Sequence, residues 1–332
     1  LRSLKRGNII VSGVTRDTPD GLLRRVTSVK RSPQSVTART VPATLPDAVT
    51  RGSFSLRCSS ALRWATNRST RLSGSPSISG PNQSHVSKCV TLNNTNLYSK
   101  AGISLVANGS TCYDGDVDLS TAWSLGLNGL IYQATFATNG TMTNDLKLTA
   151  TGSIDANGEV KVGEADATVV VPIEAVPVVV HIKIPLYVGF RAHTSQSVTQ
   201  HVTAAIPIST SVYCESGALV PCVPQNVNIG TPRFSHDAPT FSSEATLTGY
   251  ARLNLDFLIY YLAGPELSLE GSITAHVHGN NDPPWSLDAG LTADAAMRFD
   301  FLGLEGQVFN VHVWDGTWPV AQGAANPTPL PT

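Results

Sequence analysis

The chain has 332 residues, a length that allows two domains because single hydrophobic cores seldom grow beyond roughly 250–300 residues. Only 14% of the residues are charged, and Ser, Thr, Val, Ala and Gly dominate, which excludes a coiled-coil or long-helix protein and favours strands and turns. The net charge of -1 conceals a split, since residues 1–90 carry 15 Lys and Arg against three acidic residues, and the remainder carries 8 basic and 21 acidic residues.

This charge split has three interpretations. The basic segment docks on an anionic partner, or it covers the acidic body of its own chain, or the split is drift in composition without a role.

Residues 1–57 contain short alternating runs that predict a small β unit. The runs are NIIVSGV, LLRRVTSV and SVTARTV, with turn signals at 18–21 and at Ser32-Pro33 between them. Residues 42–56 predict one short helical turn followed by a last strand. Residues 58–89 are rich in Arg, Ser, Thr, Asn and Pro without periodicity, which predicts an irregular basic linker.

From residue 90 onward the strand signal is continuous. Most runs alternate apolar and polar residues at period 2, and core positions such as Leu253, Leu255, Phe257 and Ile259 follow this rule. The connections are too short for crossover helices, so the strands are expected to be antiparallel. The sequence therefore predicts an all-β chain, with a large antiparallel β-sandwich or barrel-like domain at 90–321 and a Pro-rich tail at 322–332.

Five cysteines leave one thiol over if the others pair. Cys214 and Cys222 enclose turn residues between two strand-like runs, which predicts a disulfide across a hairpin. The pairing of Cys58, Cys89 and Cys112 stays open, and their spacing lacks the second close pair that a zinc site needs. Oxidised cysteines imply a compartment outside the cytosol.

The sequence contains no run of 18 or more apolar residues, so no transmembrane segment is expected. The longest apolar run, at 169–180, is interrupted by Pro172, Glu174 and Pro177. The first residues lack the continuous apolar core of a signal peptide. We therefore expect the chain to be part of a longer exported protein.

Two groups of residues have the chemistry of weak metal ligands. Asp114, Asp116 and Asp118 alternate as at the start of a calcium-binding loop, but Leu119 and Leu125 occupy the places of the Gly and Glu that such a loop uses. Calcium held between adjacent strands is kept as an alternative to solvent-facing acids.

His276 and His278 lie two residues apart on a predicted strand and share a face, where His312 or Asp282 would be a third ligand. A solvent-facing histidine pair is the simpler interpretation, and no bound cofactor is otherwise expected.

Aromatic residues offer a carbohydrate-binding alternative. Trp314, Asp315 and Trp318 lie in a predicted turn, where two exposed rings beside a carboxylate would stack on a sugar; packing of both rings in the core is the competing interpretation. No nucleophile elbow, phosphate loop or dinucleotide fingerprint occurs, so no catalytic residue is predicted.

Two stretches carry a resemblance to a known group of proteins. GNIIVSGVTRDTPDGLLRRVTSV with TVPATLPDAVTRGSFSL, and the ordered pieces VPVVVHIKIPLYVGF, TGYARLNLDFLIYYLAGP and PPWSLDAGL, resemble an uncharacterised β-rich module of large secreted bacterial surface proteins with immunoglobulin-like repeats. Asn8 stands where Asp is usual and Arg25 where Lys is usual. The Arg-rich residues 57–90 depart from that pattern.

The resemblance brings no known activity, and it implies secretion, a multidomain context and a structural or binding role. We therefore expect a non-catalytic structural or adhesive module of a secreted or cell-surface protein, with a surface protein or glycan as partner and no nucleic acid. The alternatives are a carbohydrate-binding module and, after it, a hydrolase without a recognisable motif.

Overall fold

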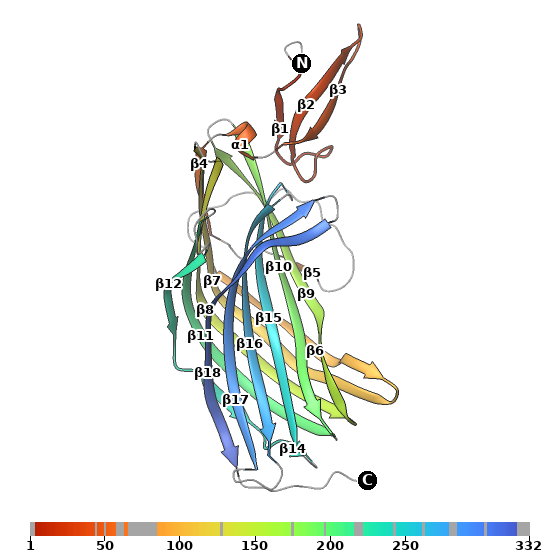
Figure 1. The fold of residues 1–332 in the computed structure, drawn as a ribbon, viewed down its shortest axis with the longest axis vertical. Coiled ribbons are helices and arrows are strands. Elements are labelled where there is room, and N and C mark those ends of the chain that lie inside the picture. The colour runs from red at the N-terminus through yellow and green to blue at the C-terminus, as the bar shows by residue number, and fades with distance from the viewer. Residues whose placement is uncertain are drawn as a thin grey trace.

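A computed structural model shows an all-β chain with one short helix (Figure 1). The structure describes residues 4–43, 45–49, 51–57, 63–65, 85–126, 129–173, 176–195, 197–215, 222–241, 244–260, 263–278, 284–301 and 304–323.

A small antiparallel sheet opens the chain. It has the order β1-β2-β3, from β1 (Ile9–Ser12), β2 (Leu22–Arg31) and β3 (Val36–Pro42). The helical turn predicted after it is confirmed as α1 (Leu45–Ala48). The three strands follow the three alternating runs of the sequence, and the turn signals fall between them.

The strand after α1 belongs to the large sheets. β4 (Arg51–Arg57) pairs with β7, so the predicted boundary at residue 57 groups this strand with the wrong sheet. The error has a physical reason, because alternation predicts a strand but does not identify its partner. β5 (Arg63–Ala65) pairs with β9 from within the predicted linker, and β6 begins at His85 rather than at residue 90.

Two larger antiparallel sheets form the body, as predicted. The seven-stranded sheet has the order β18-β17-β16-β15-β10-β9-β5, and the other has the order β12-β11-β8-β7-β4, with β6 on β7 and with β13 and β14 on β11. The strands of the first are β9 (Ile154–Ile173), β10 (Val176–Thr194), β15 (Ala245–Ile259), β16 (Ala263–Val277), β17 (Trp285–Phe301) and β18 (Leu304–Gly323).

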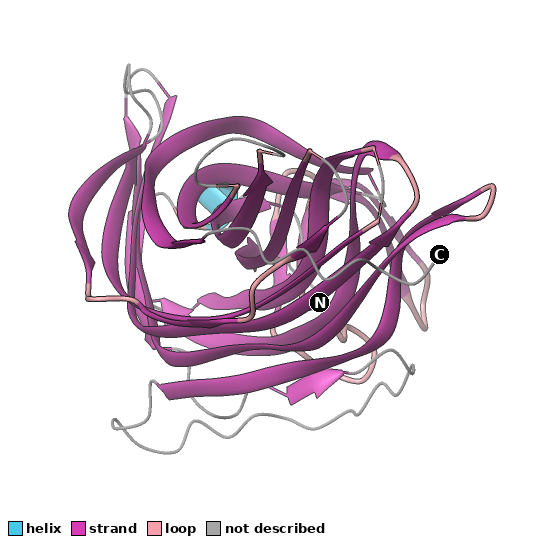
Figure 2. Cartoon of the chain, turned by 90° about the horizontal axis from the view of Figure 1, so that it is seen from below, coloured by secondary structure: helices cyan, strands magenta, loops and turns pink. Residues whose placement is uncertain are grey.

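The eight-stranded sheet contains the longest strands. These are β7 (Ile103–Gly126) and β8 (Gly129–Thr151). Beside β4, its other strands are β6 (His85–Lys100), β11 (Val198–Glu215), β12 (Cys222–Ile229), β13 (Arg233–His236) and β14 (Thr240–Phe241). Figure 2 shows that the strands curve around a shared interior.

One apolar core lies between the two large sheets. In β11 every second side chain is buried from Val198 to Cys214, which matches the period of a half-buried strand. Phe136 of β8 meets Phe257 of β15 across the interior, with ring centroids 5.7 Å apart. Long-range apolar contacts of this kind join the sheets into one unit.

The loop between β1 and β2 attaches the small sheet to the body. Nε2 of His181 on β10 lies 3.3 Å from the carbonyl oxygen of Asp20. Gly21 has a positive φ of +74°, and a Cβ there would lie 2.6 Å from Val179 and 3.1 Å from the ring of Tyr260. Glycine therefore allows this loop to approach the ends of β10 and β15.

In the part of the chain that the structure describes, no helix has the length and apolar character needed to cross a membrane.

Candidate functional site

The two tryptophans of the carbohydrate hypothesis lie in a strand. Residues 314–318 are part of β18, so the predicted turn is wrong. Trp314 and Trp318 pair with Ala293 and Ala289 of β17 and pack, half-buried, against the core. Strand periodicity continues through Gly316, and this residue produced the turn signal in the sequence.

The geometry of these two rings differs from a sugar-stacking platform. Their centroids are 6.2 Å apart and the planes are inclined by 42°. A Cβ on Gly316 would lie 2.6 Å from Trp314 and 3.3 Å from Trp318, because both indoles converge over the glycine. A flat pair of exposed rings is not formed, so this arrangement favours the core-packing interpretation; the predicted carbohydrate role stays a prediction.

Asp315 lies beside a histidine that bridges two carboxylates. Nε2 of His312 lies 2.9 Å from Asp315, and Nδ1 lies 3.0 Å from Asp294. The hydrogen bonds to Asp315 and then to Asp294 raise the pKa of His312, since both ring nitrogens donate only in the imidazolium form.

A second histidine has the same arrangement. Nδ1 of His201 lies 2.8 Å from Asp237 and Nε2 lies 2.9 Å from Asp145, while the Thr203 hydroxyl donates to Asp145 at 3.1 Å. The hydrogen bonds to Asp237 and then to Asp145 raise the pKa of His201. In each bridge the carboxylates lie on opposite sides of the ring, so one metal ion cannot use all three groups. Sequence analysis missed both bridges because each includes a carboxylate that is distant in the sequence, since Asp145 is 56 residues from His201 and Asp294 is 18 residues from His312.

His276 and His278 share a face, as their spacing predicts. The rings are nearly parallel, at 8°, with centroids 6.1 Å apart, and His276 lies 3.6 Å from Asp288. The proposed third ligand, His312, lies far from this pair. His276 pairs with Ser286 of β17 and His312 pairs with Asp294 of β17, and these two β17 residues are eight positions apart. This separation corresponds to roughly 26 Å. Asp282 lies outside the described residues.

The three aspartates of the calcium hypothesis lie at alternate positions of β7. Asp116 and Asp118 pair with Asn139 and Ala137 of β8, within a continuous strand rather than a loop. Among the residues that the structure describes, no three His, Cys, Asp or Glu side chains are grouped as metal ligands. Calcium binding here stays a prediction.

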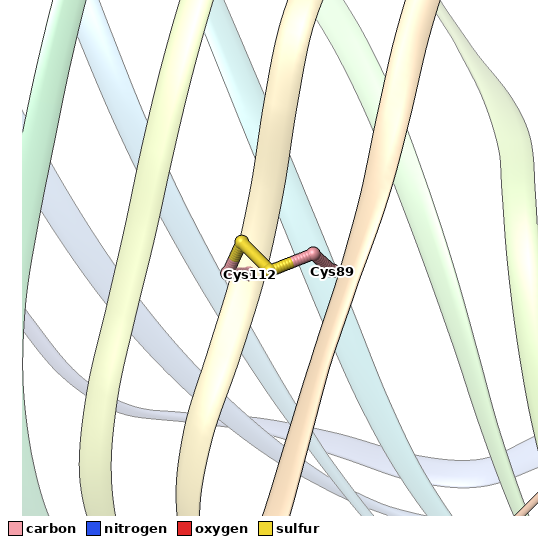
Figure 3. Close-up of a disulfide and its surroundings, with 2 residues drawn as sticks. All are labelled: Cys89 and Cys112. Atoms are coloured by element: carbon pink, nitrogen blue, oxygen red, sulfur yellow. A yellow bond between two sulfur atoms is a disulfide. The ribbon is translucent and has the colours of Figure 1, made fainter.

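Two disulfides cross neighbouring strands. Cys214–Cys222 joins β11 to β12 and confirms the predicted pair. Cys89–Cys112 joins β6 to β7, and Figure 3 shows it between the two strands. In both cases the cysteines stand directly opposite each other in the register, with Cα atoms 4.0 Å apart. Cys58 lies outside the described residues. The two disulfides suggest an oxidising compartment.

A polar hollow of about 420 Å³ lies where β10 ends, β15 begins and β16 ends. It is open to solvent and lined by His193, Ser195, Glu244, Ala245, Thr246, Val277 and His278. Nδ1 of His193 lies 3.4 Å from Asp155 at this end of the sheet, and both side chains are more than four-fifths exposed. Such hydrated groups bind small polar molecules weakly, because water competes for each contact.

On the outer face of the seven-stranded sheet, two arginines are paired with glutamates. Arg191 contacts Glu270 at 2.8 Å and lies 4.4 Å above the ring of Tyr250. Arg252 is paired with Glu159. Burial, followed by the charge of Glu159, raises the pKa of Tyr250 to about 12. These groups form a network of ion pairs on the surface, in which Nε of Arg252 is buried without a hydrogen-bond partner among the described residues.

Comparisons of the chain with protein-family models, with curated proteins and with solved structures found no match.

Proposed function

We propose that the chain is a non-catalytic structural or adhesive module of a secreted or cell-surface protein. One observation carries the proposal: very long strands close over a single core and are joined by two disulfides between neighbouring strands. β7 has 24 residues, which corresponds to roughly 80 Å of extended chain. A body of this kind keeps a fixed distance between its two ends.

The direction of the strands supports a load-bearing role. β1 lies near one end of the long axis and β18 runs toward the other, so tension applied through the chain acts nearly parallel to the large strands (Figure 1). Hydrogen bonds between antiparallel strands are perpendicular to the strand direction. Such tension therefore loads many hydrogen bonds together.

The chemistry of the surface agrees with a scaffold. Charged side chains that lie close together on this surface are held by partners of opposite charge. His201 and His312 each bridge two aspartates, and Arg191 is paired with Glu270. The disulfides support export to an oxidising compartment, and the resemblance to modules of secreted bacterial proteins belongs to the same proposal.

Single-molecule force spectroscopy tests the scaffold role. The full chain is held by its termini between α-helical marker domains, whose unfolding provides an internal force reference. We expect residues 51–323 to unfold in one event at higher force than the markers, after any release of the small sheet. Strand-by-strand release below the marker force would contradict the proposal. Treatment with a reductant serves as the control, because it lengthens the released chain without changing the number of events.

A further inference from the structure

The small sheet is strongly basic. Residues 4–43 contain eight Lys and Arg, two acidic residues and no Phe, Tyr or Trp. The basic residues are Lys5, Arg6, Arg16, Arg24, Arg25, Lys30, Arg31 and Arg39. Figure 1 shows β2 and β3, which carry five of them, extending away from the large sheets. On these strands Arg25, Lys30, Arg31 and Arg39 are exposed.

Most of these cations lack a carboxylate partner among the described residues. Arg25 pairs with Asp47. Arg31 donates to the carbonyl oxygen of Leu4 at 2.7 Å and Arg24 to the hydroxyl of Thr40 at 3.3 Å, which are neutral acceptors.

Three cations of the body are ion-paired, in contrast to most cations of the small sheet. Lys161, Arg191 and Arg252 on its outer face each have a glutamate partner. The small sheet therefore carries excess positive charge that the described part of the chain does not neutralise.

The register gathers three cations on one face of the sheet. Arg25 stands opposite Val41, Ser28 opposite Arg39, and Lys30 opposite Thr37. Residues 37, 39 and 41 alternate along β3 and so share a face, which brings Arg25, Arg39 and Lys30 to the same side. All three are exposed, and of the three Arg25 has a carboxylate partner, Asp47, so Lys30 and Arg39 carry the unneutralised charge of this face. We call this set the basic face.

The chemistry of the basic face favours a linear anion. Neighbouring like charges repel each other, and a polyanion bound along them relieves that repulsion and releases its own counterions. Arg forks match phosphate oxygens, and the hydroxyls of Ser28 and Thr37 lie between the cations as further donors. The absence of aromatic residues leaves no platform for stacking on bases or sugar rings.

A second copy of the chain is a weaker occupant. The carboxylates Glu159 and Glu270 on the outer face of the seven-stranded sheet are already held by their own arginines. Docking another basic sheet there would require these pairs to break.

We propose that the basic face binds a linear phosphodiester polymer of a cell surface through its phosphate groups alone. This inference rests on the proposed adhesive function and names its ligand chemistry. Binding then depends on charge and salt, and it is independent of the large sheets.

Fluorescence anisotropy with a labelled glycerol phosphate oligomer of about ten units tests the proposal on the full chain. We expect Lys30→Gln/Arg39→Gln to weaken binding about tenfold and to reduce the slope of log K against log salt by about 1.4, since each phosphate contact with a single chain contributes about 0.7. The matched control Lys161→Gln/Arg191→Gln removes the same charge from the body and should change affinity less than about twofold. Lys30→Arg/Arg39→Lys keeps the charges and should keep the binding.

Three results would overturn the proposal: no binding by the wild-type chain, equal losses in both Gln variants, or tighter binding of polygalacturonate, heparin or duplex DNA than of the phosphate oligomer. Thermal unfolding of each variant verifies folding, and the charge-keeping variant separates loss of charge from loss of structure. If the anisotropy experiment shows no binding but the chain unfolds in a single event at high force, only the proposed ligand is wrong. If the chain unfolds strand by strand at low force, the scaffold role itself is wrong.

Discussion

Removal of the disulfide between β6 and β7 should destabilise the protein by about 3 kcal/mol. Cys89 and Cys112 close a loop of 23 residues, and a cross-link of this length lowers the entropy of the unfolded chain by an amount equivalent to about 3.4 kcal/mol. Cys89 is exposed and Cys112 is half-buried, so replacing both by alanine adds little loss of packing. The effect should therefore come almost entirely from the unfolded state.

Guanidinium unfolding of Cys89→Ala/Cys112→Ala measures this loss, in a Cys58→Ala background that prevents thiol exchange. Cys214→Ala/Cys222→Ala is the informative comparison. Its loop of 8 residues gives an entropic term of only about 2.5 kcal/mol, but both side chains are 2% exposed and their removal adds a cavity. A loss below about 1 kcal/mol for the first pair would refute the reasoning, because strain or residual structure would then cancel the loop term.

Three further changes probe the core, a buried histidine and a close contact between strands. Phe136→Ala should lower the free energy of unfolding by about 3–5 kcal/mol, whereas Val223→Ala at a 40% exposed position should change it by less than about 0.5 kcal/mol; similar losses would contradict the core assignment. Burial lowers the pKa of His181 to about 4, below the unfolded value of 6.5, so its contribution is fully present above pH 6.5 and is lost as pH falls through about 4, by roughly 3 kcal/mol. His181→Asn should flatten this part of the stability profile, and an unchanged slope would assign it to other groups. Gly115→Ala should cost about 1–3 kcal/mol in thermal unfolding, because its Cβ would lie 2.4 Å from Cα of Gly140 on the paired strand; an unaltered midpoint would show that the strands separate freely.

The predictions that succeeded depend on local patterns. Alternation predicts the strands, the turn residues between Cys214 and Cys222 predict their disulfide, and residues 42–56 predict the turn that becomes α1. Each signal lies within a few residues of the feature that it describes. Antiparallel pairing follows because the connections are too short for crossovers.

The features that sequence analysis missed depend on partners far along the chain. β4 joins β7 across more than 60 residues, and His201 meets Asp145 across 56 residues. The turn predicted at Trp314 and Trp318 is wrong for another reason. The residues between the two tryptophans are polar residues and a glycine, which is the composition of a turn, but in the structure they continue a strand. Register, which decides these cases, is a property of the assembled sheet.

The order of the strands also determines how the chain must assemble. After β10 the chain leaves the seven-stranded sheet, builds β11 to β14 against the other sheet, and only then returns with β15. Thr194 therefore pairs with Ala245 across 51 residues and Val180 with Ile259 across 79. Contacts of such high sequence separation make folding slow, and until β15 arrives the long apolar strand β10 has one unpaired edge. We expect the newly made chain to depend on protection of that edge against aggregation before the second half is available.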